Sequence, residues 1–124
     1  MSYRLDWEAK GVVKHFYGLV TPADLVDSVT EIESDSRFDH LRYVINDFLD
    51  ITGCSAGKPE VEEISVLDYG AAVTNSNIRI AIVATHPEVL ALAKHYADSE
   101  INAYPTRIFS NREDARAWVV AKPR

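Results

Sequence analysis

Apolar residues recur along this chain in two alternating patterns, one with the period of a strand and one with the period of a helix. Tyr3, Leu5 and Trp7 alternate with polar residues, which predicts a half-buried strand. A turn over Glu8–Gly11 and a second alternating stretch over Val12–Leu19 follow. The chain is therefore expected to begin with a β-hairpin.

Three further stretches have the apolar character of buried strands. Leu41–Phe48 predicts a third strand, which leads into a polar loop over Leu49–Lys58. The nearly continuous apolar run Ile78–Thr85 is typical of a strand covered on both faces, and Thr106–Phe109 predicts a short last strand.

Helical spacing separates these strands, and each helical stretch has a recognisable start. Thr21 can cap a helix that begins at Pro22 and ends near Ser34. Pro59 begins a second helix that reaches about Asn75. Capping boxes at Thr85-His86-Pro87-Glu88 and Ser110-Asn111-Arg112-Glu113 predict two more.

The order of predicted elements is ββαβαβαβα, which defines the α/β fold class. Strands that alternate with helices imply right-handed crossovers and a parallel sheet. We expect a mostly parallel five-stranded sheet with an antiparallel N-terminal edge strand and with helices packed on it.

Length, charge and cysteine content narrow the class of protein. A chain of 124 residues predicts one domain over residues 1–124. The net charge of −6, without a basic stripe, argues against a nucleic-acid partner. The single cysteine, Cys54, fits a reducing cytoplasm. No apolar stretch is long enough for a signal peptide or a membrane span, so we expect a cytoplasmic protein.

Polar residues gather where the central strand is predicted to end. In open parallel sheets, ligands bind at the carboxyl ends of strands. The carboxylates of Asp47 and Asp50 could act in acid–base chemistry or hold Mg²⁺, or they could simply accept hydrogen bonds from loop amides. A crevice at this edge would be ringed by Asn46, Asp47, Thr52, Thr85, His86 and Ser110.

The second predicted helix carries a buried charge and a spare apolar side. Asp68 falls on the packing face together with Val61 and Ile64, so it needs a partner, for which Arg79, Asn46 and Arg42 are the candidates. A second apolar stripe comprises Val66, Tyr69 and Val73. This stripe predicts contact either with a neighbouring helix of the chain or with a partner subunit.

The residues offer no catalytic constellation. The four histidines, His15, His40, His86 and His95, lack the spacing that zinc requires, and no nucleophile–base–orienter set can be assembled. We therefore predict a protein that is not an enzyme and that uses no metal or cofactor.

Several local sequences, in this order, are similar to those of a known family. They are Gly18-Leu19-Val20-Thr21-Pro22, Tyr43-Val44-Ile45-Asn46-Asp47, the crossing over Ile51–Pro59, and Ile78–Thr85. The chain resembles the STAS group typified by the bacterial anti-sigma-factor antagonists (the SpoIIAA-like fold), and especially its uncharacterised stand-alone STAS/SEC14-like members. The resemblance implies a regulatory or scaffolding module that binds another protein or forms a homodimer. The alternative is a binder of a small apolar or nucleotide-like ligand in the strand-end crevice.

Switch-type members of that group are phosphorylated in an Asp-Ser-[Ser/Thr]-Gly motif before the second helix. Asp50-Ile51-Thr52-Gly53 copies its outline and would make Thr52 the phosphoacceptor, but it comes early after the strand. Alignment by the strand instead matches Asp47 to the strand-end aspartate and places Ser55 near the phosphoacceptor, without the motif's own aspartate. Because both registers depart from the motif, we expect that the phosphorylation switch is not intact.

Overall fold

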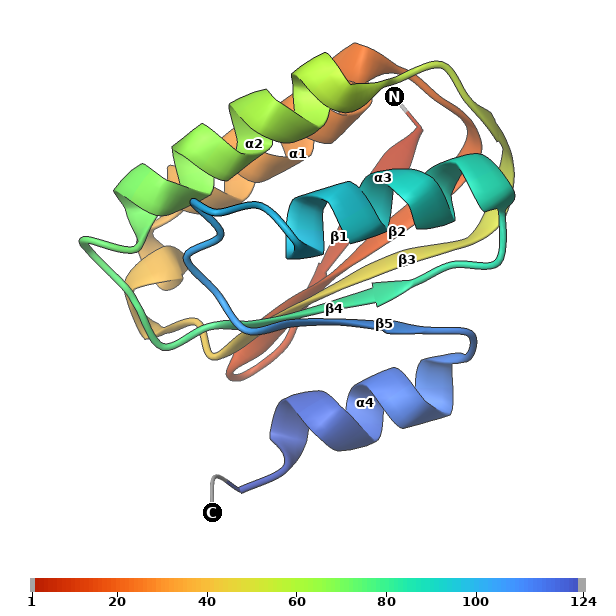
Figure 1. The fold of residues 1–124 in the computed structure, drawn as a ribbon. Coiled ribbons are helices and arrows are strands. Elements are labelled where there is room, and N and C mark those ends of the chain that lie inside the picture. Colours follow the sequence, from red (N-terminus) through yellow and green to blue (C-terminus); the bar gives the residue numbers. More distant parts are fainter. Residues whose placement is uncertain (1, 123–124) are drawn as a thin grey trace.

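The computed structural model describes residues 2–122 as one five-stranded sheet with helices on both of its faces (Figure 1). The elements in chain order are β1 Tyr3–Trp7, β2 Gly11–Val20, α1 Pro22–Glu33, the 3₁₀ helix η1 Ser36–His40, β3 Tyr43–Cys54, α2 Lys58–Ala71, β4 Arg79–Val83, α3 Pro87–Ala97, β5 Thr106–Phe109 and α4 Arg112–Val120.

The strands lie in the order β1-β2-β3-β4-β5, with β3 in the centre. β1 pairs with β2 antiparallel, and every other pair is parallel. The predicted fold class and the antiparallel edge strand are therefore confirmed. Each parallel connection is a single crossover that returns the chain to the next position in the sheet. The order of the strands in the sheet therefore follows their order in the sequence.

Helices α1, α2 and α3 cover one face of the sheet and α4 covers the other (Figure 1). On β3, Val44 and Phe48 belong to the larger core under α1–α3, whereas Tyr43 and Ile45 belong to a smaller core under α4. Both faces of β3 are thus covered, because successive side chains of a strand point to opposite faces.

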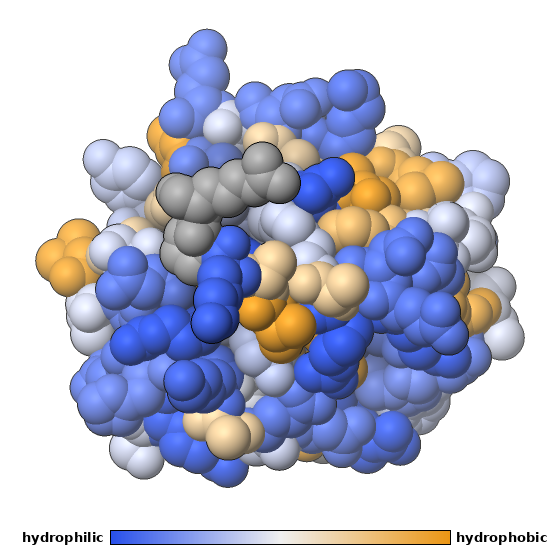
Figure 2. Space-filling view, turned by 90° about the horizontal axis from the view of Figure 1, so that it is seen from below, coloured by the Kyte–Doolittle hydropathy of each residue, from blue (hydrophilic) through white to orange (hydrophobic). Residues whose placement is uncertain are grey.

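Arginines join the α4 layer to the sheet. Arg116 of α4 forms an ion pair with Glu8. Arg79 of β4 donates to the backbone carbonyls of Trp118 and Ala121. The ring of Phe109 packs against that of Trp118. On this side of the molecule the apolar surface forms separate areas among polar residues (Figure 2). Among the described residues visible in this view, the α4 side therefore has no continuous apolar surface.

The third strand is longer than predicted. The sequence suggested an end at Phe48 and a loop over Leu49–Lys58, but β3 continues to Cys54 beside the second half of β2. Two irregularities in the β2–β3 register, between His15 and Tyr17 and between Gly18 and Leu19, keep the strands paired. Polar residues are tolerated in this extension because it lies beyond β4, which ends opposite Asp47.

Helix limits also differ from the predicted ones. α2 ends at Ala71 rather than near Asn75, whose side chain donates instead to the carbonyls of Phe38 and Leu41. The segment 35–40, between the first predicted helix and the third predicted strand, contains η1. The N-cap of α1 is Thr21, as predicted, whereas α3 and α4 are capped by His86 and Asn111, one residue later than expected.

Candidate functional site

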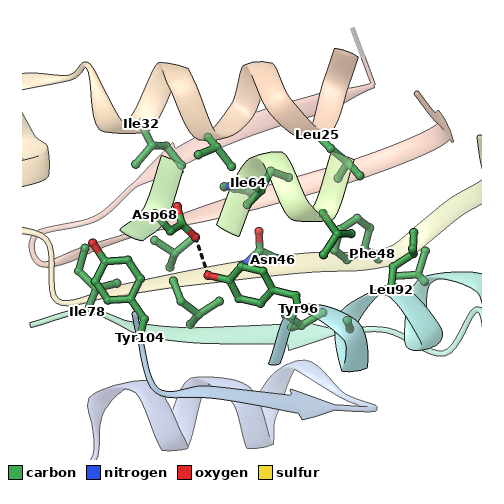
Figure 3. Close-up of a pocket in the computed structure, with 18 of the residues that line it drawn as sticks. Leu25, Ile32, Asn46, Phe48, Ile64, Asp68, Ile78, Leu92, Tyr96 and Tyr104 are labelled. Carbon is green, nitrogen blue, oxygen red and sulfur yellow. Dashed lines mark hydrogen bonds between the residues drawn. The ribbon is translucent and has the colours of Figure 1, made fainter. Parts of the chain in front are cut away.

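A cavity of about 110 Å³ lies between the sheet and helices α1–α3 (Figure 3). Its walls are mainly apolar and come from both layers, including Leu25 and Val29 of α1, Phe48 of β3, Val61 of α2 and Leu92 of α3. The interior of a close-packed domain rarely leaves so much space. This cavity is therefore the principal candidate for a binding site in the described part of the chain.

Charged and polar side chains lie in the same apolar wall. They are Lys14 of β2, Glu33 of α1, Asn46 of β3, Asp68 of α2, Tyr96 of α3, and Tyr104, which precedes β5. The Tyr96 hydroxyl donates to Asp68 Oδ2 at 2.5 Å (Figure 3), and Lys14 Nζ donates to Ser28 Oγ at 3.3 Å. Polar groups from five secondary-structure elements thus meet at one cavity.

Burial shifts the pKa of two of these groups. It lowers the pKa of Lys14 to about 8, although the charges of Asp68 and Glu33 oppose this change. Burial also raises the pKa of Glu33 to about 9, and a hydrogen bond to Asp68 and its charge add to the effect. Near neutral pH, Lys14 is therefore mainly an ammonium and Glu33 is a neutral carboxylic acid.

The raised pKa of Glu33 predicts a pH dependence of stability. A glutamate in the unfolded chain ionises near pH ~4.3, whereas Glu33 in the folded chain keeps its proton up to about pH 9. The folded state binds more protons between these values, so the free energy of unfolding should fall as pH rises. Glu33→Gln cannot titrate and should lack this part of the slope.

Urea unfolding of both proteins at about pH 5 and about pH 8 would measure this difference. Wild type should lose more stability over this range than Glu33→Gln does. The lowered pKa of Lys14 has the opposite effect above about pH 8, because there the unfolded chain binds more protons than the folded one and stability rises with pH. The measurements therefore stop at about pH 8. Equal slopes for the two proteins would contradict a protonated Glu33.

The strand-end carboxylates belong to a separate cluster on the α4 face. Arg112 of α4 donates to Asp47 Oδ2 at 2.5 Å and to Asp50 Oδ2 at 3.1 Å. His15 of β2 also faces both, with Nε2 at 3.0 Å from Asp50 Oδ2. Asp47 is buried and accepts a hydrogen bond from the Leu49 amide. The two carboxylates thus share Arg112 as a cationic partner and fix the start of α4 to the sheet.

The residues expected around a strand-end crevice do not share one cavity. Asn46 lines the interior cavity and donates to the Ala81 carbonyl, while Asp47 lies on the other face of the sheet. Thr85 and Ser110 are exposed, and His86 has a buried Nδ1 without a hydrogen-bond partner among the described residues.

The two candidate phosphoacceptors differ in their surroundings. Thr52 is exposed within β3 and not at a helix start. Ser55 is also exposed, but it follows β3 and precedes Gly57, the N-cap of α2, and its backbone N–H donates to the Val20 carbonyl. Of the two hydroxyl groups, only that of Ser55 lies close to the N-terminus of α2.

Asp68 has different partners from those expected. The sequence suggested Arg79, Asn46 or Arg42, but Asp68 interacts with Tyr96 and Glu33. Arg79 is on the opposite face of the sheet, where it binds carbonyls at the end of α4. Arg79 cannot reach Asp68 because the face of a strand residue decides which helix layer it contacts. Asn46 lines the same cavity as Asp68 but donates to the Ala81 carbonyl instead.

The apolar stripe on α2 lies on the surface. The exposed fractions of the side chains are 62% for Val66, 61% for Tyr69 and 88% for Val73. Val73 follows the last residue of the helix, in the turn. No helix of the described chain covers these residues, so contact with a neighbouring helix does not explain the stripe.

Sequence reasoning missed Lys14, Glu33 and Tyr96 as site residues. The alternation of β2 gave a usable signal for Lys14, because it lies in phase with the fully buried Val12 and Phe16. A lysine at a buried phase needs partners or a cavity. Glu33 and Tyr96 had no comparable signal, since each lies near the end of its helix, among residues of mixed character.

Two further searches of the described residues concern metals and membranes. Within residues 2–122, no three His, Cys, Asp or Glu side chains gather so that they could hold a metal ion. Likewise, no helix in this range has the length and apolar character needed to cross a bilayer.

Comparison with known proteins identifies the fold. No family model and no curated protein matches the chain. An uncharacterised DUF3478 protein with a SpoIIAA-like fold from Shewanella loihica PV-4 superposes with a TM-score of 0.55 and 13% identity, covering 94% of this chain and 91% of the other. The anti-sigma factor antagonist SpoIIAA in its unphosphorylated form gives 0.63 and 11%, covering 95% and 96%.

The phosphorylated form of the Bacillus cell-fate determinant SpoIIAA gives a TM-score of 0.58 and 14% identity, covering 94% of this chain and 98% of the other. Identities this low extend the likeness to the fold alone. The chain therefore has a SpoIIAA-like fold of the STAS type, as its resemblance to that family implied.

Proposed function

We propose that this chain is a non-catalytic, regulatory protein-interaction module of STAS type, formed by a single domain over residues 1–124, that acts in the cytoplasm. The observation that carries the proposal is the exposed apolar stripe formed by Val66 and Tyr69 of α2 and by Val73 in the turn that follows. The fold supports it, since SpoIIAA, which has the same fold, is described as an anti-sigma factor antagonist.

Helix α2 has a buried side and an exposed apolar side. Val61, Ser65 and Asp68 face the interior and are buried. The exposed stripe lies on another side of the helix, where polar residues would make a monomer more soluble. Tyr is enriched among residues that contribute most to protein–protein affinity, because it offers a large apolar ring and a polar end. The stripe therefore suits a protein surface, and a second copy of the chain is the first partner to test.

The partner surface can be tested with Tyr69→Glu. A charge at the centre of an apolar interface should weaken self-association by at least about 2 kcal/mol, or roughly 30-fold in Kd. Light scattering coupled to size exclusion, over a range of concentrations, should find wild type as a dimer and Tyr69→Glu as a monomer.

Val120→Glu is the matched control for this experiment. Val120 is 60% exposed, similar to Tyr69, but it ends α4 on the opposite face of the sheet. This variant should remain dimeric. If wild type is monomeric, or if Tyr69→Glu leaves the dimer unchanged, the stripe does not mediate self-association.

Phosphorylation does not form part of the proposed mechanism. Thr52 lies within a strand, and the register that brings Ser55 near the start of α2 lacks the motif's aspartate. A phosphate at a helix N-terminus would be stabilised there, but the recognition sequence of a switch is incomplete in this chain. The module is therefore proposed to act through constitutive contacts.

A small-ligand function is the second candidate, and the interior cavity is the observation that favours it. At about 110 Å³ the cavity is smaller than an engineered apolar cavity of ~150 Å³ that binds benzene, so it does not suit a nucleotide. Of the residues expected around the strand-end crevice, Asn46 lines this cavity.

A further inference from the structure

We propose that the cavity between the sheet and helices α1–α3 binds a small uncharged molecule with an apolar body and one carbonyl oxygen, which accepts a hydrogen bond from Lys14. This inference deepens the ligand-binding alternative. It does not depend on the surface of α2.

The size of the cavity limits the ligand. A volume of about 110 Å³ is about three quarters of that of the benzene-binding cavity cited above, so it corresponds to a short or branched chain of about four or five non-hydrogen atoms. The walls that would contact its body are aliphatic and aromatic, including Leu25, Ile32, Phe48, Ile64 and Leu92 (Figure 3). A long lipid chain would not fit.

The charges around the cavity already balance, and this excludes a charged ligand. Lys14 contributes an ammonium, Asp68 a carboxylate and Glu33 a neutral acid held by Asp68. A further anion or cation would enter an apolar site without a counter-ion, and burial of an unpaired charge is strongly unfavourable. The preferred ligand is therefore neutral.

Lys14 determines the polar group of the ligand. An ammonium has three N–H donors, and the described chain supplies one hydrogen-bond acceptor to Lys14, the Ser28 hydroxyl at 3.3 Å. Lys14 is only 6% exposed, so bulk water does not solvate the other donors freely. Because Lys14 lines the cavity, an acceptor oxygen on a bound molecule would satisfy a donor that the protein leaves without a partner.

Butanone is a suitable probe, since it combines a short apolar chain with one carbonyl oxygen and is smaller than benzene. Titration into the ¹⁵N-labelled full chain should give saturable shifts in the amide signals of residues around the cavity, such as Val29, Phe48 and Val61. 2-Methyl-1-butene has the same shape without the acceptor, and propanoate has the same size with a charge. Both should bind at least about tenfold more weakly, because a hydrogen bond to a charged donor is lost or an unpaired charge is buried.

Two variants test the same assignment from the protein side. Lys14→Met keeps an apolar chain of similar length, and it should abolish the preference for butanone over 2-methyl-1-butene. Val61→Phe should fill the cavity and block both ligands. If Lys14→Met does not fold, the comparison of ligands in wild type still tests the role of Lys14.

The proposal is overturned if butanone produces no saturable shifts at the cavity, or if the charged or acceptor-free analogue binds as tightly. It is also overturned if folded Lys14→Met retains the preference for butanone. Repeating the titration with Tyr69→Glu separates this result from the proposed interface, since that variant should bind butanone as wild type does.

Discussion

Asp68→Ala should lower the free energy of unfolding by about 3–5 kcal/mol. Asp68 is only 8% exposed, accepts a hydrogen bond from Tyr96, and lies close enough to Lys14 to oppose the lowering of its pKa. Removing the carboxylate leaves a buried ammonium without its counter-charge and a buried phenol without its acceptor. The loss should appear as a lower urea midpoint with an unchanged m-value.

Two further variants separate the charge from the hydrogen bond. Asp68→Asn keeps an acceptor for Tyr96 but removes the charge, so it should lose most of the same stability if the charge matters more. Lys14→Met combined with Asp68→Leu removes both ions and should recover much of the loss, because an apolar replacement of a buried pair is often nearly neutral. A loss of less than about 1 kcal/mol in Asp68→Ala would contradict a buried, coupled network.

Phe16→Ala should cost about 3–5 kcal/mol, the range measured for removal of a buried phenylalanine side chain. Phe16 is fully buried on β2, and its ring stacks on that of Phe48 with centroids 4.4 Å apart and planes at 3°. The centroid of its ring also lies 6.0 Å from that of the Tyr3 ring. The substitution would open space between β1, β2 and β3, in the larger core that surrounds the cavity.

Leu19→Ala is the control for Phe16→Ala, because Leu19 lies on the same strand and is 52% exposed. A surface substitution of this kind should change stability by no more than about 0.5 kcal/mol. Urea or thermal unfolding followed by circular dichroism measures both variants. A similar, small loss in both would mean that the Phe16–Phe48 stack does not belong to the stabilising core.

The proposed functions use opposite sides of the α1–α3 layer. The stripe Val66, Tyr69 and Val73 faces outward from α2, while Asp68 on the same helix faces the cavity. Asp68 lies two residues after Val66 and one before Tyr69, which places it on a different side of the helix. The experiments on Tyr69 and on the cavity test the two sites separately.

Much of the fold was predictable from local patterns. Alternation over Tyr3–Trp7, the continuous apolar run beginning at Ile78 and the cap at Thr21 each depend on neighbours in sequence, so element order and sheet class followed. The length of β3 did not follow, because Asp50 and Gly53 are poor strand residues. Their strand conformation depends on pairing with the far half of β2, more than thirty residues earlier.

The sequence by itself determined the ββαβαβαβα order, the buried central strand and the two-sided character of α2, since these depend on the spacing of apolar residues and on helix caps. Only the tertiary structure decided that Lys14, Glu33, Asp68 and Tyr96 surround one cavity, and that Asp47 and Arg79 lie on the other face of the sheet. The physical reason is that partners of buried charges are chosen by which face of the sheet each residue occupies and by which helix covers that face. Both depend on contacts between segments distant in the chain.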